Sequence, residues 1–306
     1  MRPLAIASLA ALASSLGAGC NLKQFTVDTT APVIQDASRS FEAESDLRVA
    51  REAAPAQLKT ADGFLAASPK NRILLEVVAQ GYVEYAFGFL EDDLEQLPDD
   101  EAHAAERAEV SHRATRLYER SLAFALRLLD LDDKSFSDAF GKDVAGTVAA
   151  TKKLDKRSVA GMFFTGLALA SAINLNKEDL ARIIELPKAI ALEKRVRELD
   201  PGFYNGGASM VLGTIYASQG KAIGGDPDAA RRCFDEAIAA TGGRFLLARV
   251  MMARYYAVTV QDRALFEKTL KDVLAAPEDI YPEYRLANAF AKRRAARYLA
   301  RIDEFF

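Results

Sequence analysis

Residues 204–240 constrain the fold of this chain more than any other stretch. Small and aromatic residues recur there at helical spacing: Leu212, Gly213, Tyr216, Ala230, Phe234 and Ala237. The glycine and the alanines allow two helices to approach closely, and the aromatic rings fill the space that remains between them. The stretch therefore predicts two antiparallel helices packed face to face.

This spacing resembles the tetratricopeptide helix pair, with additional residues in the turn. One pair cannot bury its apolar face alone, so such pairs stack into arrays. Weaker forms of the pattern occupy residues 71–129, 158–199 and 245–274, and a final helix over 284–306 has a basic face suited to capping. The predicted fold is all-α: a tetratricopeptide-like helical array (α-solenoid) of about four helix-pair units plus capping helices.

Residues 158–174 are almost wholly apolar. Their length falls just short of a membrane span, and basic residues precede them. We therefore expect a central buried helix at this position, with Gly166 and Ala170 allowing close packing on one side.

The amino terminus has the features of a secretory leader. Arg2 supplies one positive charge, an apolar run follows, and small residues precede Cys20. Residues 16–20 resemble a bacterial lipobox, although Leu16 lies one position earlier than usual. We expect a lipoprotein signal peptide over 1–19, lipid on Cys20, a flexible tether over 20–39 and a helical domain over 40–306. The alternative is an ordinary secretory peptide that ends near a cysteine.

Catalytic and metal-binding motifs are not found in the sequence. It contains no G-x-S-x-G, P-loop or H-E-x-x-H motif. The only histidines, His103 and His112, are nine residues apart, which places them half a turn out of register on a helix. We expect no metal, no cofactor and no enzymatic activity. The weakest alternative is a hydrolase whose site has no recognisable motif.

The charge and the cysteines exclude further classes. The formal net charge of −3 provides no electrostatic basis for binding nucleic acid. If Cys20 belongs to the leader, Cys233 has no partner for a disulfide and is expected to act as a small apolar core residue.

Aromatic residues on the first helices of two units are the candidate ligand contacts: Tyr82, Tyr85, Phe89, Phe163 and Phe164. In helical arrays these helices line the concave side, where an apolar cleft could take an elongated hydrophobic ligand or a partner segment. Packing in the core is the other interpretation of the same rings. By contrast, Gly213, Tyr216, Ala230, Phe234 and Ala237 are expected to be structural, so residues 204–240 should define the fold without touching the ligand.

An ordered set of short motifs resembles a known family. It comprises the lipobox, Pro69-x-Asn71, Tyr82-x-x-Tyr85-Ala86, RATRLYERSL from Arg113, Phe164-Thr165-Gly166, Asn205-Gly206-Gly207 and Gly224-Gly225-Asp226-Pro227. Together these motifs resemble the T component of tripartite ATP-independent periplasmic (TRAP) transporters, the TatT lipoproteins. The chain has no tryptophan, and Phe164 stands where one is expected in this family.

The resemblance implies a non-enzymatic accessory subunit with four cryptic tetratricopeptide units. It implies a homotrimer whose protomers each have a pore or cleft, and which docks a periplasmic TRAP-type solute-binding protein. A hydrophobic small molecule is the implied ligand. The implied location is the periplasmic face of a bacterial envelope membrane, the outer membrane in preference to the inner, with attachment through lipid on Cys20. The alternative is a general envelope scaffold that binds protein segments in its groove.

Overall fold

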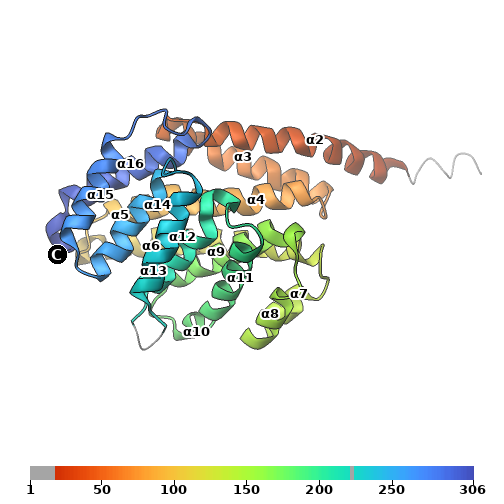
Figure 1. Cartoon of the computed structure of the whole chain (residues 1–306). Helices are drawn as coiled ribbons and strands as arrows, with labels where there is room; N and C mark the ends of the chain where they lie inside the picture. Colours follow the sequence, from red (N-terminus) through yellow and green to blue (C-terminus); the bar gives the residue numbers. More distant parts are fainter. Residues whose placement is uncertain (1–17, 221–223) are drawn as a thin grey trace, which may run out of the picture.

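The computed structural model describes residues 18–220 and 224–306 (Figure 1). Its α-helices are α2 (Ala18–Glu42), α3 (Leu47–Ala67), α4 (Arg72–Tyr85), α5 (Glu91–Gln96), α6 (Ala104–Asp130), α7 (Phe136–Lys142), α8 (Val144–Thr151), α9 (Val159–Leu175), α10 (Leu180–Ile183), α11 (Leu186–Leu199), α12 (Phe203–Ser218), α13 (Pro227–Ala240), α14 (Leu246–Met251), α15 (Arg263–Ala275) and α16 (Arg285–Ala300). Two π-helical turns, η1 (Ala86–Leu90) and η5 (Met252–Ala257), join α4 to α5 and extend α14. Short 3-10 turns are η2 (Glu101–His103), η3 (Lys156–Ser158), η6 (Pro282–Tyr284) and η7 (Ile302–Glu304). Throughout these ranges there is no strand, so the all-α prediction is confirmed.

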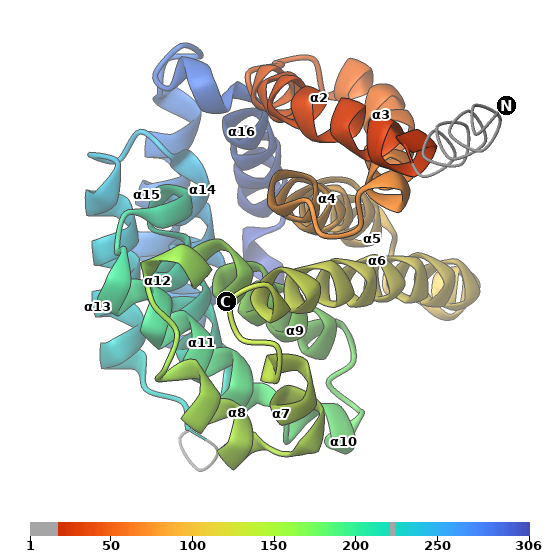
Figure 2. The ribbon, with the colours of Figure 1, turned by 90° about the vertical axis from the view of Figure 1, so that its right-hand side faces the viewer.

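The helices follow one another around a central axis. Helix α4 packs on α6, α6 on α9, α9 on α11, α11 on α12 and α12 on α13. The C-terminal helix α16 then returns to contact α2 and α3, so the two ends of the array lie side by side (Figures 1 and 2). This curvature encloses a space that the helices of a straight stack would leave open.

Local sequence signals place the helix ends. Asp46, Asn71 and Asp226 precede α3, α4 and α13, and each accepts hydrogen bonds from backbone N–H groups of the first turn. Pro227 follows as the first residue of α13, where its missing N–H has no cost.

Helix α9 is the central buried helix that the apolar run predicts. Most of its side chains are buried, including Met162, Phe163 and Phe164. The segments Arg72–Gln96 and Lys156–Leu175 are long and apolar enough to span a membrane, but 61% and 67% of their apolar windows are buried inside the protein. Both segments therefore serve as core helices of the folded body.

The α12–α13 pair has the close contact that its sequence predicts. A Cβ atom built on Gly213 would lie 3.1 Å from the Phe234 ring, so the ring rests directly on the glycine. Ala230, Phe234 and Ala237 are fully buried, and Tyr216 is partly buried beside them.

The tether expected over 20–39 is instead helical, because most of it belongs to α2. Val27 and Ala31 are buried against the body, and Asp28 accepts hydrogen bonds from Ser68 (2.6 Å) and Asn71 (2.7 Å). The stretch is polar on average, yet a narrow apolar face is sufficient to hold a helix. Cys20 falls in the first turn of α2, and residues 1–17 of the expected signal peptide lie outside the described residues.

Charged residues join α16 to α5. The buried carboxylate of Asp92 lies 2.6 Å from Arg293 and 2.8 Å from Arg297. Glu95 accepts from Arg297 at 2.5 Å and from the Tyr298 hydroxyl at 2.8 Å. Burial by itself raises the pKa of Glu95, but Arg294 and Arg297 outweigh it and lower that pKa. These ion pairs link residues about two hundred positions apart and hold the array in its curved form.

Candidate functional site

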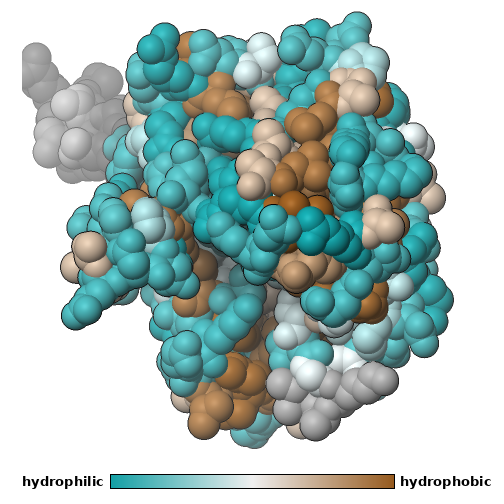
Figure 3. All heavy atoms as spheres, turned by 90° about the vertical axis from the view of Figure 1, so that its left-hand side faces the viewer, coloured by the Kyte–Doolittle hydropathy of each residue, from teal (hydrophilic) through white to brown (hydrophobic). Residues whose placement is uncertain are grey.

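A cavity of about 420 Å³ occupies the middle of the array. Side chains reach it from α2, α3, α4, η1, α9, α12, α14, η5 and α16, so segments far apart in the sequence contribute to its wall. The wall is largely apolar, with a few polar groups, which is the usual composition and size of a small-molecule site. On the face shown in Figure 3, by contrast, hydrophobic residues gather in patches between hydrophilic areas.

Both π-helical turns lie at this cavity. Phe87, Gly88 and Phe89 line it from η1, and Tyr255 lines it from η5. A π-turn changes the direction of the following side chains and occurs often at functional sites. Within η1 the Phe87 carbonyl accepts a 2.8 Å hydrogen bond from Arg294 of α16. The local departure from α-helical geometry therefore shapes the wall and anchors the last helix.

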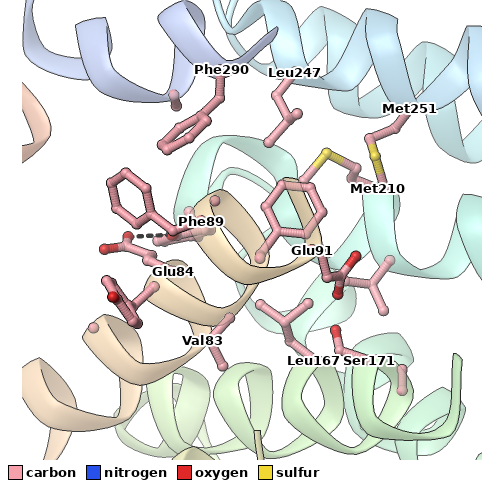
Figure 4. Close-up of a pocket in the computed structure, with 18 of the residues that line it drawn as sticks. Val83, Glu84, Phe89, Glu91, Leu167, Ser171, Met210, Leu247, Met251 and Phe290 are labelled. Atoms are coloured by element: carbon pink, nitrogen blue, oxygen red, sulfur yellow. Dashed lines mark hydrogen bonds between the residues drawn. The ribbon is translucent and has the colours of Figure 1, made fainter. Parts of the chain in front are cut away.

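Of the five aromatic candidates, Tyr85 and Phe89 line the cavity. Their ring centroids are 5.3 Å apart, and the Phe89 ring meets Phe290 edge-on at 5.0 Å. Figure 4 shows Phe290 extending from α16 toward Phe89. The C-terminal helix thus supplies an aromatic contact that no repeat pattern pointed to.

The other three candidates lie in the core. Tyr82 stacks on Phe124 at 5.9 Å and its hydroxyl contacts Asp62. Phe163 and Phe164 are completely buried and pack against the rings of Phe203 and Tyr204. The cleft expectation fails for these three, because their helix faces turn toward neighbouring helices. The structure places these three rings in the core, which was the other interpretation.

Residues 204–240 do reach the cavity, contrary to expectation. Tyr204, Met210, Val211, Thr214 and Ile215 of α12 all line it. The repeat positions lie on the opposite face of the same helix, where they contact α13. The repeat pattern marks only the positions that face α13, so it does not indicate the face of α12 that lines the cavity.

The start of α12 has an unusual backbone. Tyr204, Asn205 and Gly206 have φ angles of 48°, 60° and 76°, all in the left-handed region. Such a conformation is costly for the tyrosine and is kept only where the surroundings over-determine it. Here the Tyr281 hydroxyl donates to Asn205 at 2.9 Å, and the Tyr204 hydroxyl donates to Glu84 at 2.5 Å. The Asn-Gly-Gly sequence is the one signal that could have indicated this kink.

Two carboxyl groups from different helices meet beside Tyr204. The Gln80 side-chain amide donates to Glu42 of α2 at 2.5 Å and to Glu84 of α4 at 2.8 Å. Burial, followed by the proximity of Glu84, raises the pKa of Glu42 to about 8, and burial also raises the pKa of Glu84. Neither glutamate was a candidate in the sequence, because 42 residues separate them and no motif contains them.

A third carboxyl group, that of Glu91, lies further along the same helical segment (Figure 4). It accepts a short hydrogen bond from the Tyr118 hydroxyl. Burial raises the pKa of Glu91 to about 7, while Arg294 and Lys177 act in the opposite direction. Among the described residues no group of His, Cys, Asp and Glu has metal-binding geometry.

The fold and the cavity define the class of this protein. It is an all-α array of consecutively packed helices with an apolar cavity of about 420 Å³ at its centre. The chain belongs to the TRAP transporter T-component family, whose model matches residues 43–306. It is also 24% identical to an uncharacterized protein of Treponema pallidum (strain Nichols), over 95% of this chain and 94% of that protein. The family is an accessory component of a transport system.

Proposed function

We propose that this protein is a non-enzymatic, lipid-anchored subunit of a TRAP-type uptake system. In this proposal it docks a periplasmic solute-binding protein and holds a hydrophobic ligand in the central cavity during transfer. The protein acts as a homotrimer on the periplasmic face of the outer membrane, attached through Cys20. The observation that carries the proposal is an apolar cavity of about 420 Å³ at the centre of a TRAP T-component.

The construction of the wall supports a ligand-binding role. Met210 of α12 and Met251 of α14 both line the cavity, as does Leu247 (Figure 4). Methionine side chains are flexible and polarizable, so they adapt to ligands of varied shape. The wall also includes both π-turns and the left-handed kink, three features that cost stability and are typical of functional sites.

Native mass spectrometry tests the ligand directly. The protein is purified from its own membranes and analysed intact, and a bound apolar molecule should add a discrete mass. The variant Met210→Trp places a bulky indole at the cavity wall and should reduce or abolish that mass, while Leu274→Trp, at an exposed site on α15, should keep it. Retention of the same mass by Met210→Trp would exclude the cavity as the binding site.

Docking is tested by crosslinking in intact cells followed by mass spectrometry. The recovered material should contain a solute-binding protein of the TRAP type in amounts comparable to this chain. Recovery of this chain without such a partner would contradict docking. Recovery of cell-wall or assembly proteins instead would favour the general envelope scaffold.

A further inference from the structure

The charges that line the cavity are unequal in number. Among the described lining residues there are three carboxyl groups, Glu42, Glu84 and Glu91, and one ammonium group, Lys177. An apolar cavity intended for a purely hydrophobic molecule has no need of three buried acids, because each carries a desolvation cost. The three carboxyl groups therefore indicate what kind of ligand the cavity binds.

Glu91 already has one donor and two nearby cations within the protein. Tyr118 donates to it, and Arg294 and Lys177 favour its ionised form. Among the described residues, the pair formed by Glu42 and Glu84 has no comparable cation beside it. Its donors, Gln80 and Tyr204, are neutral, and the cation that acts on Glu42, Arg39, is exposed and paired with Asp36.

The pair also keeps free hydrogen-bonding capacity. Both donations from Gln80 and the one from Tyr204 go to the Oε1 atoms. The Oε2 atom of Glu84 accepts no hydrogen bond from the described residues and is not sealed off by protein atoms. Glu84 lines the cavity and its side chain extends into it (Figure 4). This acceptor is therefore available to a ligand.

Aromatic rings lie around the carboxyl pair. Tyr85, Tyr204 and Tyr284 line the cavity, and Tyr284 is close enough to Glu42 and Glu84 for their charges to raise its pKa further after burial. A carboxyl pair flanked by aromatic rings attracts an ammonium group, which donates hydrogen bonds to the oxygens and is attracted to the faces of the rings. An anionic head group would be repelled at this position.

We propose that the cavity takes an amphipathic ligand with an apolar tail and a cationic ammonium head group, and that Glu42 and Glu84 bind the head. The inference rests on the proposed ligand-binding function and names the class of ligand. The tail extends toward the apolar part of the wall, which includes Met210 and Met251. The ammonium group takes the place of the proton that the empty pair retains, so binding releases a proton.

Calorimetry with three probes tests the head group. Octylammonium, octanol and octanoate are titrated into the full chain in phospholipid nanodiscs, and the heat from empty nanodiscs is subtracted. At about pH 9, octylammonium should bind about tenfold or more tightly than octanoate, the effect of a charge-assisted hydrogen bond. Its affinity should fall as the pH is lowered through about 8, where Glu42 takes up a proton.

Isosteric variants separate the contribution of the head group to the affinity from that of the tail. Glu84→Gln, and independently Glu42→Gln, should weaken octylammonium about tenfold and leave octanol unchanged. The matched control Glu52→Gln, at an exposed position on α3, should change neither affinity. Octanol binding as tightly as octylammonium, with no effect of either variant, would overturn the head-group inference and leave the cavity function standing. Failure of all three probes to bind would overturn both.

Discussion

At the scale of single residues, the carboxyl pair makes stability depend on pH. Burial raises the pKa of Glu42 from its ordinary value of 4.5 to about 8, so the folded protein holds a proton that the unfolded chain releases. This contribution to stability is fully present below the ordinary value and is lost as the pH rises through about 8. The proton on Glu42 is therefore a property of the folded state.

We predict that Glu42→Gln removes this dependence, because glutamine does not ionise. Between about pH 5 and pH 8 the melting temperature of the wild type should fall relative to that of Glu42→Gln. Differential scanning calorimetry across this range measures the difference. Parallel curves for the two proteins would mean that Glu42 ionises freely in the fold.

Gly213 provides a second prediction at this scale. Gly213→Val should destabilise the protein by about 1–3 kcal/mol, because the added atoms would overlap the Phe234 ring. The same substitution at Gly63 on α3 has no atom within 4 Å of the new Cβ and should be tolerated. Urea unfolding of both variants gives the comparison, and an equal loss at the two sites would contradict the packing argument.

At the scale of elements, the ion pairs between α5 and α16 close the array. Asp92→Asn leaves the buried guanidinium group of Arg294 and the partly buried one of Arg297 undercompensated. Breaking a buried charge network in this way typically costs about 3–5 kcal/mol. The control Asp36→Asn disrupts an exposed pair with Arg39 and should cost less than about 1 kcal/mol.

Chemical denaturation measures the loss of unfolding free energy in both variants. Hydrogen exchange shows which helices are destabilised in Asp92→Asn. Faster exchange in α16 than in α9 would show that the closure opens before the core. Similar small losses in the two variants would indicate that the packing of Phe290 and Tyr298 closes the array without help from charge.

At the scale of the whole molecule, the amino-terminal helix connects the body to the proposed anchor. Because α2 is continuous from the region of Cys20 to the cavity wall at Phe41 and Glu42, the anchor and the site are joined by helix and not by a loose tether. The cavity is therefore expected to sit at a defined distance from the membrane.

Labelling with radioactive palmitate checks the anchor. The wild type should be labelled and recovered with membranes, whereas Cys20→Ala should be unlabelled and recovered in the periplasmic fraction. Equal labelling of both proteins would exclude Cys20 as the lipid attachment site.

The local features of the fold were predictable from the sequence. The all-α class and the close α12–α13 contact follow from residue periodicity, and the burial of α9 follows from its almost wholly apolar sequence. Periodicity is a short-range property, because one turn of helix decides which side chains share a face. It placed Tyr82, Tyr85 and Phe89 together on the first helix of one predicted unit.

Only the tertiary structure decided what each face contacts. Tyr82 packs in the core and Tyr85 lines the cavity, although three residues separate them. Glu42 and Glu84 become a pair because α2 and α4 are brought together with Tyr204 of α12 at a left-handed kink. The sequence by itself determined the helices and their buried sides. The cavity and its carboxyl pair depend on contacts between distant segments, which the return of α16 to α2 and α3 completes.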